Sequence, residues 1–225
     1  MADEKQKYVR TKTPKGIAQY PWINTPDTKF SADGDFKCNL IVPAKEAKSF
    51  IKLIDEEAKK AVESFKAKEK KPTKGKKPKP IVEGDKPYFE ELDDDGEPTG
   101  NIIFRTKQRA KITTKKGDVI EKSIVIYDAK GKRIQANVGG GSTVILGVEL
   151  PHYFVPASNA AGVSLRLQAV QVLDLVEFGG NSASSYGFGE EDGYEGEAYK
   201  PSKSKNNKKD SDDSEDESDE DEEVY

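Results

Sequence analysis

One stretch decides how this chain folds: residues 36–66 read FKCNLIVPAKEAKSFIKLIDEEAKKAVESFK. Every second residue from Phe36 to Val42 is apolar, which is the pattern of a half-buried strand. Beyond Pro43 the apolar residues recur every three or four positions. That spacing predicts an amphipathic helix over about 44–69, with one face on a core. The chain therefore combines β structure with one long helix.

Outside this stretch the strand pattern returns between frequent turns, such as Asp33-Gly34 and Lys130-Gly131. We expect strands over residues 17–23, 36–42, 101–114, 119–127, 144–150 and 162–178, and a loop over 152–154. In the last strand, alternation places four residues inward: Val163, Leu165, Leu167 and Ala169. The pattern predicts a mainly β fold with one long inserted α-helix, an antiparallel β-barrel like the five-stranded oligonucleotide-binding (OB) barrel. Other small barrels and sandwiches fit the same pattern.

Charge divides the chain into a basic body and an acidic tail. Residues 210–225 hold eleven acidic residues and no basic one, so the other residues carry 37 basic and 30 acidic groups, a balance of +7. We expect a folded core over 1–180, a flexible linker over 181–209 and a disordered acidic tail over 210–225. A cationic body is typical of proteins that bind polyanions.

Several classes of protein are disfavoured. Cys38 is the only cysteine, so neither an intramolecular disulfide nor a thiol cluster for zinc is expected. His152 is the only histidine, and we interpret it as a plain surface residue. Because no catalytic set is found, we predict no enzymatic activity and no cofactor. The polar N-terminus and the lack of a long apolar run predict a soluble protein of the cytoplasm, with no membrane partner.

The strand predicted over 101–114 is the first candidate site. Alternation places four cations on one face, without an interleaved acid: Arg105, Lys107, Arg109 and Lys111. Four apolar residues face the core: Ile102, Phe104, Ala110 and Ile112. Such a row is favourable against a phosphate backbone, where it releases counterions. The alternative is an ordinary solvated outer face.

Aromatic residues and a basic loop extend this hypothesis. Single-stranded nucleic acid is bound by a cationic groove together with aromatic platforms for the bases. Seven aromatic residues lie near predicted strand ends or loops: Tyr20, Trp22, Tyr88, Phe89, Tyr127, Tyr153 and Phe154. We select Tyr153 and Phe154 for base stacking, although any one aromatic residue fits core packing as well. Residues 66–80 hold eight lysines, and in this basic loop we select Lys74, Lys76 and Lys77 for phosphate contacts. A solubilising linker is the alternative.

The end of the tail is a candidate site for a protein partner. Seven residues form it: Asp219, Glu220, Asp221, Glu222, Glu223, Val224 and Tyr225. A basic pocket on a partner is able to grip an acidic run that ends in an apolar pair and a free carboxylate. The tail is also able to fold back on the cationic groove of its own chain and compete with DNA. Plain solvation is the third reading.

Four segments carry a resemblance to a known family: GKKPKPIVEGDKPYF (75–89), DAKGKRI (128–134), GGGS (139–142) and VSLRLQAVQVLDLVEFGG (163–180). With the acidic, aromatic-ended tail, they make the chain resemble the single-stranded-DNA-binding proteins of short-tailed bacteriophages. The family pattern usually ends in Phe, whereas this chain ends in Tyr225.

The resemblance implies an OB-fold core with a long helix inserted between strands. It also implies binding to single-stranded DNA, strand annealing, homodimerisation and roles in phage DNA replication, recombination and repair. The tail of such proteins contacts the phage DNA polymerase and helicase–primase, and Lys107 and Lys74 match basic positions that support DNA binding. A different class remains open, an acidic-tailed scaffold or chaperone that binds basic proteins instead of DNA.

Overall fold

The computed structural model describes residues 8–68, 80–114 and 117–177. Within these ranges the chain forms one helix, α1 (Ala44–Lys68), and fourteen strands. The strands are β1 (Val9–Lys12), β2 (Gly16–Asp27), β3 (Asp35–Pro43), β4 (Val82–Glu83), β5 (Tyr88–Leu92), β6 (Pro98–Arg109), β7 (Lys111–Thr113), β8 (Val119–Glu121), β9 (Val125–Tyr127), β10 (Arg133–Ile134), β11 (Thr143–Leu150), β12 (His152–Val155), β13 (Ala160–Val163) and β14 (Leu165–Asp174).

Five of these strands close into a barrel. The neighbours run in the order β2, β3, β6, β14 and β11, and β11 pairs again with β2. All contacts in this ring are antiparallel except the one between β6 and β14, which is parallel. This is the order of an OB-fold barrel, with α1 inserted between its second and third strands, as predicted.

The helix covers one part of the barrel because its apolar residues share one face. Phe50 and Ile54 are buried in the same core as Leu40 of β3 and Phe104 of β6. The Phe50 and Phe104 rings meet edge to face, with their centroids 5.1 Å apart. The remaining surface of the helix is dominated by Lys and Glu, as expected for an amphipathic helix.

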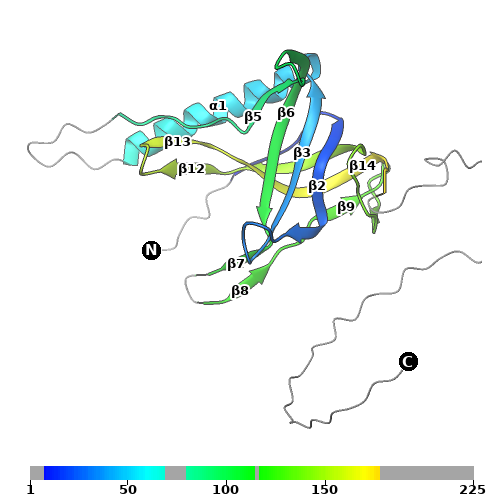
Figure 1. The fold of residues 1–225 in the computed structure, drawn as a ribbon. Coiled ribbons are helices and arrows are strands. Elements are labelled where there is room, and N and C mark those ends of the chain that lie inside the picture. The colour runs from blue at the N-terminus through cyan, green and yellow to red at the C-terminus, as the bar shows by residue number, and fades with distance from the viewer. Residues whose placement is uncertain (1–7, 69–79, 115–116, 178–225) are drawn as a thin grey trace, which may run out of the picture.

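A smaller apolar cluster joins the outer half of α1 to β12 and β13. Val62 of the helix, Ile81 and Ala161 are buried together, and Phe65 and Phe154 pack against them. Figure 1 shows β12 and β13 beside the helix, on the side of the barrel away from the β7–β8 hairpin. The helix is therefore fixed at both the barrel core and this second cluster.

The stretch that decided the fold behaves as predicted. The helix spans Ala44–Lys68 against the expected 44–69, and it begins directly after Pro43. Four alternate residues of β3 are buried: Phe36, Cys38, Leu40 and Val42. The alternation expected for residues 144–150 is confirmed as well, since Val144, Leu146, Val148 and Leu150 are all buried.

The strand predicted over 101–114 is wrong at its end, because the chain leaves the barrel at Ala110. The Ala110 N–H donates to the Gly34 carbonyl at 2.9 Å, and its own carbonyl accepts from Lys122 N–H at 2.7 Å. The following residues form the separate hairpin β7–β8, so Ile112 is exposed instead of lying in the core. For the same reason the strand predicted over 119–127 is split into β8 and β9.

The inward position predicted for Ala169 is also wrong. The register between β11 and β14 shifts between Gly147 and Val148, which leaves Gln168 without a partner on β11. This bulge moves the alternation by one residue. Val170 and Val172 are buried in consequence, whereas Ala169 is only half-buried.

The loop expected over 152–154 is instead strand β12, antiparallel to β13. His152 is not a plain surface residue: its Nε2 atom lies 3.3 Å from Oε2 of the buried Glu57 on α1. A sequence pattern does not reveal this contact, because the two residues are far apart in the chain. In the ranges that the structure describes, no helix is long and apolar enough to cross a membrane.

Candidate nucleic-acid interface

The outer face of β2, β3 and β6 carries the cationic residues in an ordered array. The three strands lie side by side, as Figure 1 shows, and their register sets rows across the face. One row is Gln19, Asn39 and Arg105; the next is Trp22, Lys37 and Lys107; the third is Asp27, Asp35 and Arg109. In OB folds, the second and third strands are the ones that bind oligonucleotides, and here these are β3 and β6.

A bulge in β2 brings Trp22 into this array. Gln19 pairs with Asn39 and Trp22 with Lys37, so two residues of β2, Tyr20 and Pro21, oppose the single Cys38. Proline has no N–H to lose from a ladder and is therefore tolerated at a bulge. Tyr20 has a φ of 49°, in the left-handed region that non-glycine residues rarely adopt. Without the extra residue, Trp22 would lie on the opposite face of β2.

Acidic residues of the third row hold the lysines of the array in place. The Lys107 ammonium lies 2.8 Å from the Asp35 carboxylate, and Lys37 pairs with Asp27. The hydrogen bond from Lys37 lowers the pKa of Asp27, which keeps this carboxylate charged. No acid is interleaved among the cations along β6 itself, and the acid that pairs with Lys107 comes from the neighbouring strand β3.

Aromatic rings accompany the cations on the same surface. The Arg105 guanidinium lies 4.3 Å from the centre of the Phe89 ring, and the Lys37 ammonium lies 6.0 Å from the centre of the Trp22 ring. Phe30, in the connection between β2 and β3, is exposed beside them. The surface therefore offers charge for phosphates and flat apolar rings for bases.

A hollow with a volume of about 490 Å³ lies along the edge of β6 that pairs with β14. Arg105, Lys107, Arg109, Arg166 and Tyr153 are among its lining residues. The hollow is bounded by β6, by the start of β14 and by β12, which belongs to the connection between β11 and β14. That connection is the second loop region through which OB folds contact oligonucleotides.

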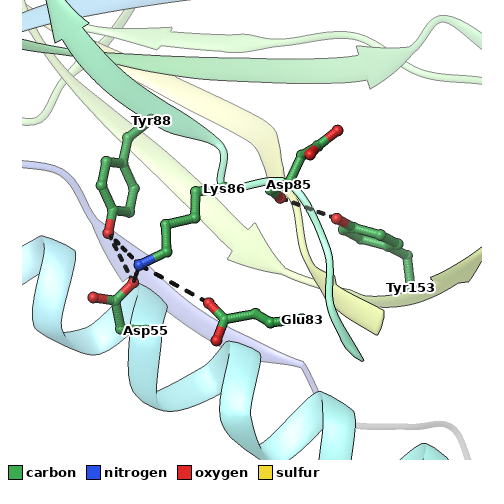
Figure 2. A network of polar contacts seen from close by, with 6 residues as sticks. All are labelled: Asp55, Glu83, Asp85, Lys86, Tyr88 and Tyr153. Atoms are coloured by element: carbon green, nitrogen blue, oxygen red, sulfur yellow. Dashed lines mark hydrogen bonds and ion pairs between the residues drawn. The ribbon is translucent and has the colours of Figure 1, made fainter. Parts of the chain in front are cut away.

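Tyr153 is held firmly at the rim of this hollow. Its hydroxyl donates to the Asp85 carbonyl at 3.0 Å, which Figure 2 shows. Its ring lies against Gly84 and Gly162, where an added Cβ would stand only 2.5 Å and 2.9 Å from the hydroxyl oxygen. Burial and the charges of Asp85 and Glu83 raise the pKa of Tyr153, so the hydroxyl stays neutral and available as a donor.

The other selected residues lie in different surroundings. Phe154 stacks on Phe65 of α1 with centroids 5.3 Å apart, in the second apolar cluster. Lys111 belongs to the β7–β8 hairpin and lies 3.5 Å from Glu121. The structure thus brings Arg105, Lys107, Arg109 and Tyr153 together, but not Phe154. Three selected lysines and the selected tail residues lie outside the residues that the structure describes: Lys74, Lys76, Lys77 and residues 219–225.

Five residues of this surface are absent from the set selected on the sequence: Trp22, Phe30, Lys37, Phe89 and Arg166. The alternation in 36–42 already places Lys37 outward, so this lysine was within reach of sequence reasoning. The sequence indicates only that Trp22 is an aromatic residue near a strand end, because the bulge that orients it leaves no periodic signal. Phe30 follows Lys29 in a connection between strands, where no hydrophobic periodicity indicates the direction of a side chain.

The barrel order and this surface define an OB-fold protein with the geometry of a nucleic-acid binder. The family model described as "Single-stranded DNA-binding protein, Bacteriophage T7" matches residues 15–175. The chain is 31% identical over 181 residues to the single-stranded DNA-binding protein of Enterobacteria phage T3, covering 76% of this chain and 74% of the relative. It is 30% identical over 170 residues to that of Escherichia phage T7, covering 72% and 71%.

A solved structure agrees with the sequence relatives. The crystal structure of gp2.5, a single-stranded DNA-binding protein encoded by bacteriophage T7, superposes with a TM-score of 0.57 at 26% identity, covering 85% of this chain and 100% of that one. The chain therefore belongs to the T7-type family of phage single-stranded DNA-binding proteins, which confirms the resemblance seen in the sequence.

Proposed function

We propose that this chain coats single-stranded DNA without reading its sequence. Phosphates contact Arg105, Lys107 and Arg109, while bases stack on the exposed rings of Trp22 and neighbouring aromatic residues. One observation carries the proposal: on the outer face of β2, β3 and β6, the cations lie beside exposed aromatic rings, Lys37 beside Trp22 and Arg105 beside Phe89 of the adjoining β5. The names of the phage relatives support it.

The carboxylates under the lysines fit this role. Asp35 is 12% exposed in its side chain, whereas its partner Lys107 is 63% exposed. The Asp35 carboxylate orients the Lys107 ammonium, and the exposed side of that ammonium stays open to a phosphate. Lysine makes such contacts as a flexible point charge and does not select a base. This arrangement suits a protein that must bind any sequence.

Basic residues outside the described ranges extend the proposed site. Lys74, Lys76 and Lys77 follow the helix in sequence and supply further phosphate contacts. Tyr153 and Phe154 remain proposed stacking residues, with Tyr153 better placed because it lines the cationic hollow.

The acidic tail is the proposed contact with other replication proteins. Residues 219–225 bind the phage DNA polymerase and helicase–primase, and in the free protein the tail screens the cationic face. The opposite charges of body and tail, +7 and −11, support both roles. We further propose that the protein is a homodimer, promotes annealing, and acts in replication, recombination and repair of phage DNA inside the bacterial host.

Fluorescence anisotropy with oligothymidine over a salt series tests the proposal, with duplex DNA as competitor. We expect tight, salt-sensitive binding that prefers the single strand. Deletion of residues 210–225 should strengthen this binding, because a competitor for the cations is removed. Absent or duplex-preferring binding would refute the coating function and favour a scaffold that binds basic proteins through its tail.

A further inference from the structure

The β7–β8 hairpin stands apart from the barrel. Its two strands pair with each other and, among the described residues, with no other strand. Its base is tied down where Lys122 N–H donates to the Ala110 carbonyl and Ala110 N–H donates to the Gly34 carbonyl. Figure 1 shows the hairpin projecting from the end of the barrel where β6 finishes. The hairpin thus continues β6 beyond the last cation of the array, Arg109.

The two faces of this hairpin differ. Ile112 and Ile120 form a direct cross-strand pair, so their side chains share one face. Thr113 pairs with Val119 on the other face. All three apolar side chains are solvent-exposed, at 39% for Ile112, 44% for Ile120 and 59% for Val119. A two-stranded ribbon has no core of its own in which to bury such residues.

The isoleucine face of the hairpin adjoins the cationic hollow, and Val119 is not among the residues that line it. Ile112 lines the same hollow as Arg105, Arg109 and Arg166. The apolar pair is therefore continuous with the cationic surface. A polyanion held by these arginines would pass directly beside Ile112 and then Ile120. Among polyanions, single-stranded nucleic acid has exposed apolar base faces that match such a pair, whereas in duplex DNA those faces are stacked inside the helix.

We propose that the Ile112–Ile120 face of the hairpin is an apolar base-binding platform for single-stranded DNA that lies in the adjacent cationic hollow. This assignment rests on the proposed DNA-binding function. The arginines take the phosphates and the isoleucine pair covers bases at the end of the array. The platform favours single strands over duplexes, because it contacts surfaces that pairing and stacking hide.

The test compares the full-length double variant Ile112→Ser/Ile120→Ser with the matched control Val119→Ser, on the opposite face. Oligothymidine affinity should fall about tenfold for the double variant and remain within about twofold for the control. The slope of log affinity against log salt should not change, because no phosphate contact is lost. Ile120→Phe should bind at least as tightly as wild type, since a ring stacks better on a base.

Other outcomes overturn the proposal that Ile112 and Ile120 bind bases. Equal losses in the double variant and the control would mean that the hairpin matters only as a folded unit. Unchanged DNA affinity with a lower mass in sedimentation would assign the isoleucine face to a second copy of the chain. If wild-type protein fails to bind oligothymidine, the proposed function itself fails. If wild type binds and the double variant binds equally well, only the platform fails.

Discussion

Ion pairs lie on two sides of this protein. Those on the outer face connect strands of one sheet, whereas those on the helix side connect the helix to another element. On the outer face, Lys107 and Asp35 belong to neighbouring strands of one sheet that hydrogen bonds already hold together. On the helix side, the Lys86 ammonium lies 2.9 Å from Asp55 of α1 and donates to the Tyr88 hydroxyl, which in turn donates to Asp55. Figure 2 shows this second network joining the helix to Lys86 and to Tyr88 at the start of β5.

The ion pairs on the outer face are suited to binding a ligand, whereas the network on the helix side supports the fold. On the outer face, a cation is able to exchange its carboxylate for a phosphate without loosening the fold, because the ladder holds β3 and β6 together. On the helix side, the same exchange would release one element from another. The presence of a charge therefore does not identify a candidate interface. The better criterion is whether the two members of an ion pair lie in one sheet or in two separate elements.

The largest expected effect comes from removing two cations of the outer face. Arg105→Ala/Lys107→Ala should weaken oligothymidine binding about tenfold to one-hundredfold, and should lower the salt slope by about 1.4, or roughly 0.7 for each lost phosphate contact. Anisotropy titrations across a salt series measure both quantities. Thermal unfolding should change little, because the β3–β6 ladder remains.

The matched control removes the same charge from the helix side. Lys52→Ala/Lys59→Ala changes two exposed lysines of α1 and should leave both affinity and salt slope near the wild-type values. An equal loss of affinity in the two double variants would show that the net charge, and not the array on β6, determines binding.

A smaller effect is expected at Glu57, where burial would raise the pKa but hydrogen bonds with Lys60 and His152 outweigh it and lower the pKa. A carboxylate with a lowered pKa stabilises the fold above its ordinary value of 4.5, and this contribution is lost as the pH falls through the folded-state value. Glu57→Gln should therefore cost about 1–2 kcal/mol at neutral pH and make the acid side of the stability profile less steep. Chemical denaturation across pH measures it.

Glu63→Gln provides the comparison for this variant, since Glu63 is an exposed carboxylate on the same helix. Its pH profile should follow that of the wild type. A Glu57→Gln profile that runs parallel to the wild type at every pH would show that the carboxylate does not link the helix to β12.

At the helix network we expect a still smaller effect. Asp55→Ala should lower the unfolding free energy by about 1 kcal/mol, because its partner Lys86 is partly exposed and solvent screens the pair. Tyr88→Phe removes only the hydroxyl and should cost less. DNA affinity should be unchanged in both, in contrast to the outer-face variant. A loss of affinity without a loss of stability would contradict the assignment of this network to support.

The smallest effect is expected at Cys38, whose side chain is fully buried in β3. Burial raises the pKa of this thiol to about 12, so the thiolate is scarce at neutral pH. A thiol reagent should not label the folded protein and should label it rapidly in denaturant. Rapid labelling of the native protein would mean that β3, and with it the outer face, opens readily.

Patterns along the chain predicted the elements that place one regular face on the core. The α1 helix and the buried alternation of β3 follow from spacing alone, because one face of each lies on the core. The bend at Ala110 was missed, since its cause is a hydrogen bond to Gly34 on a distant turn. The bulge at Gln168 was missed for a related reason, because only pairing with β11 exposes the extra residue.

In the candidate site, too, the features set by alternation along one strand were predictable and the contacts between strands were not. Period-2 geometry predicts that Arg105, Lys107, Arg109 and Lys111 share a face. This holds for the first three, which lie on β6, whereas Lys111 lies on the β7–β8 hairpin. Their acidic partners and the Phe89 ring could not be predicted, because they arrive from other strands. The position of Phe154 against the helix was likewise hidden, as its partner Phe65 lies in α1.

The insertion of α1 has a consequence for how this protein acquires its activity. β3 and β6 are direct neighbours, yet their closest paired residues, Pro43 and Asn101, are 58 positions apart in the sequence. Pairing at such separation is slow, because a long loop must be closed before any contact is gained. A newly made chain should therefore form its helix early and become competent to hold DNA only after the distant strands have met.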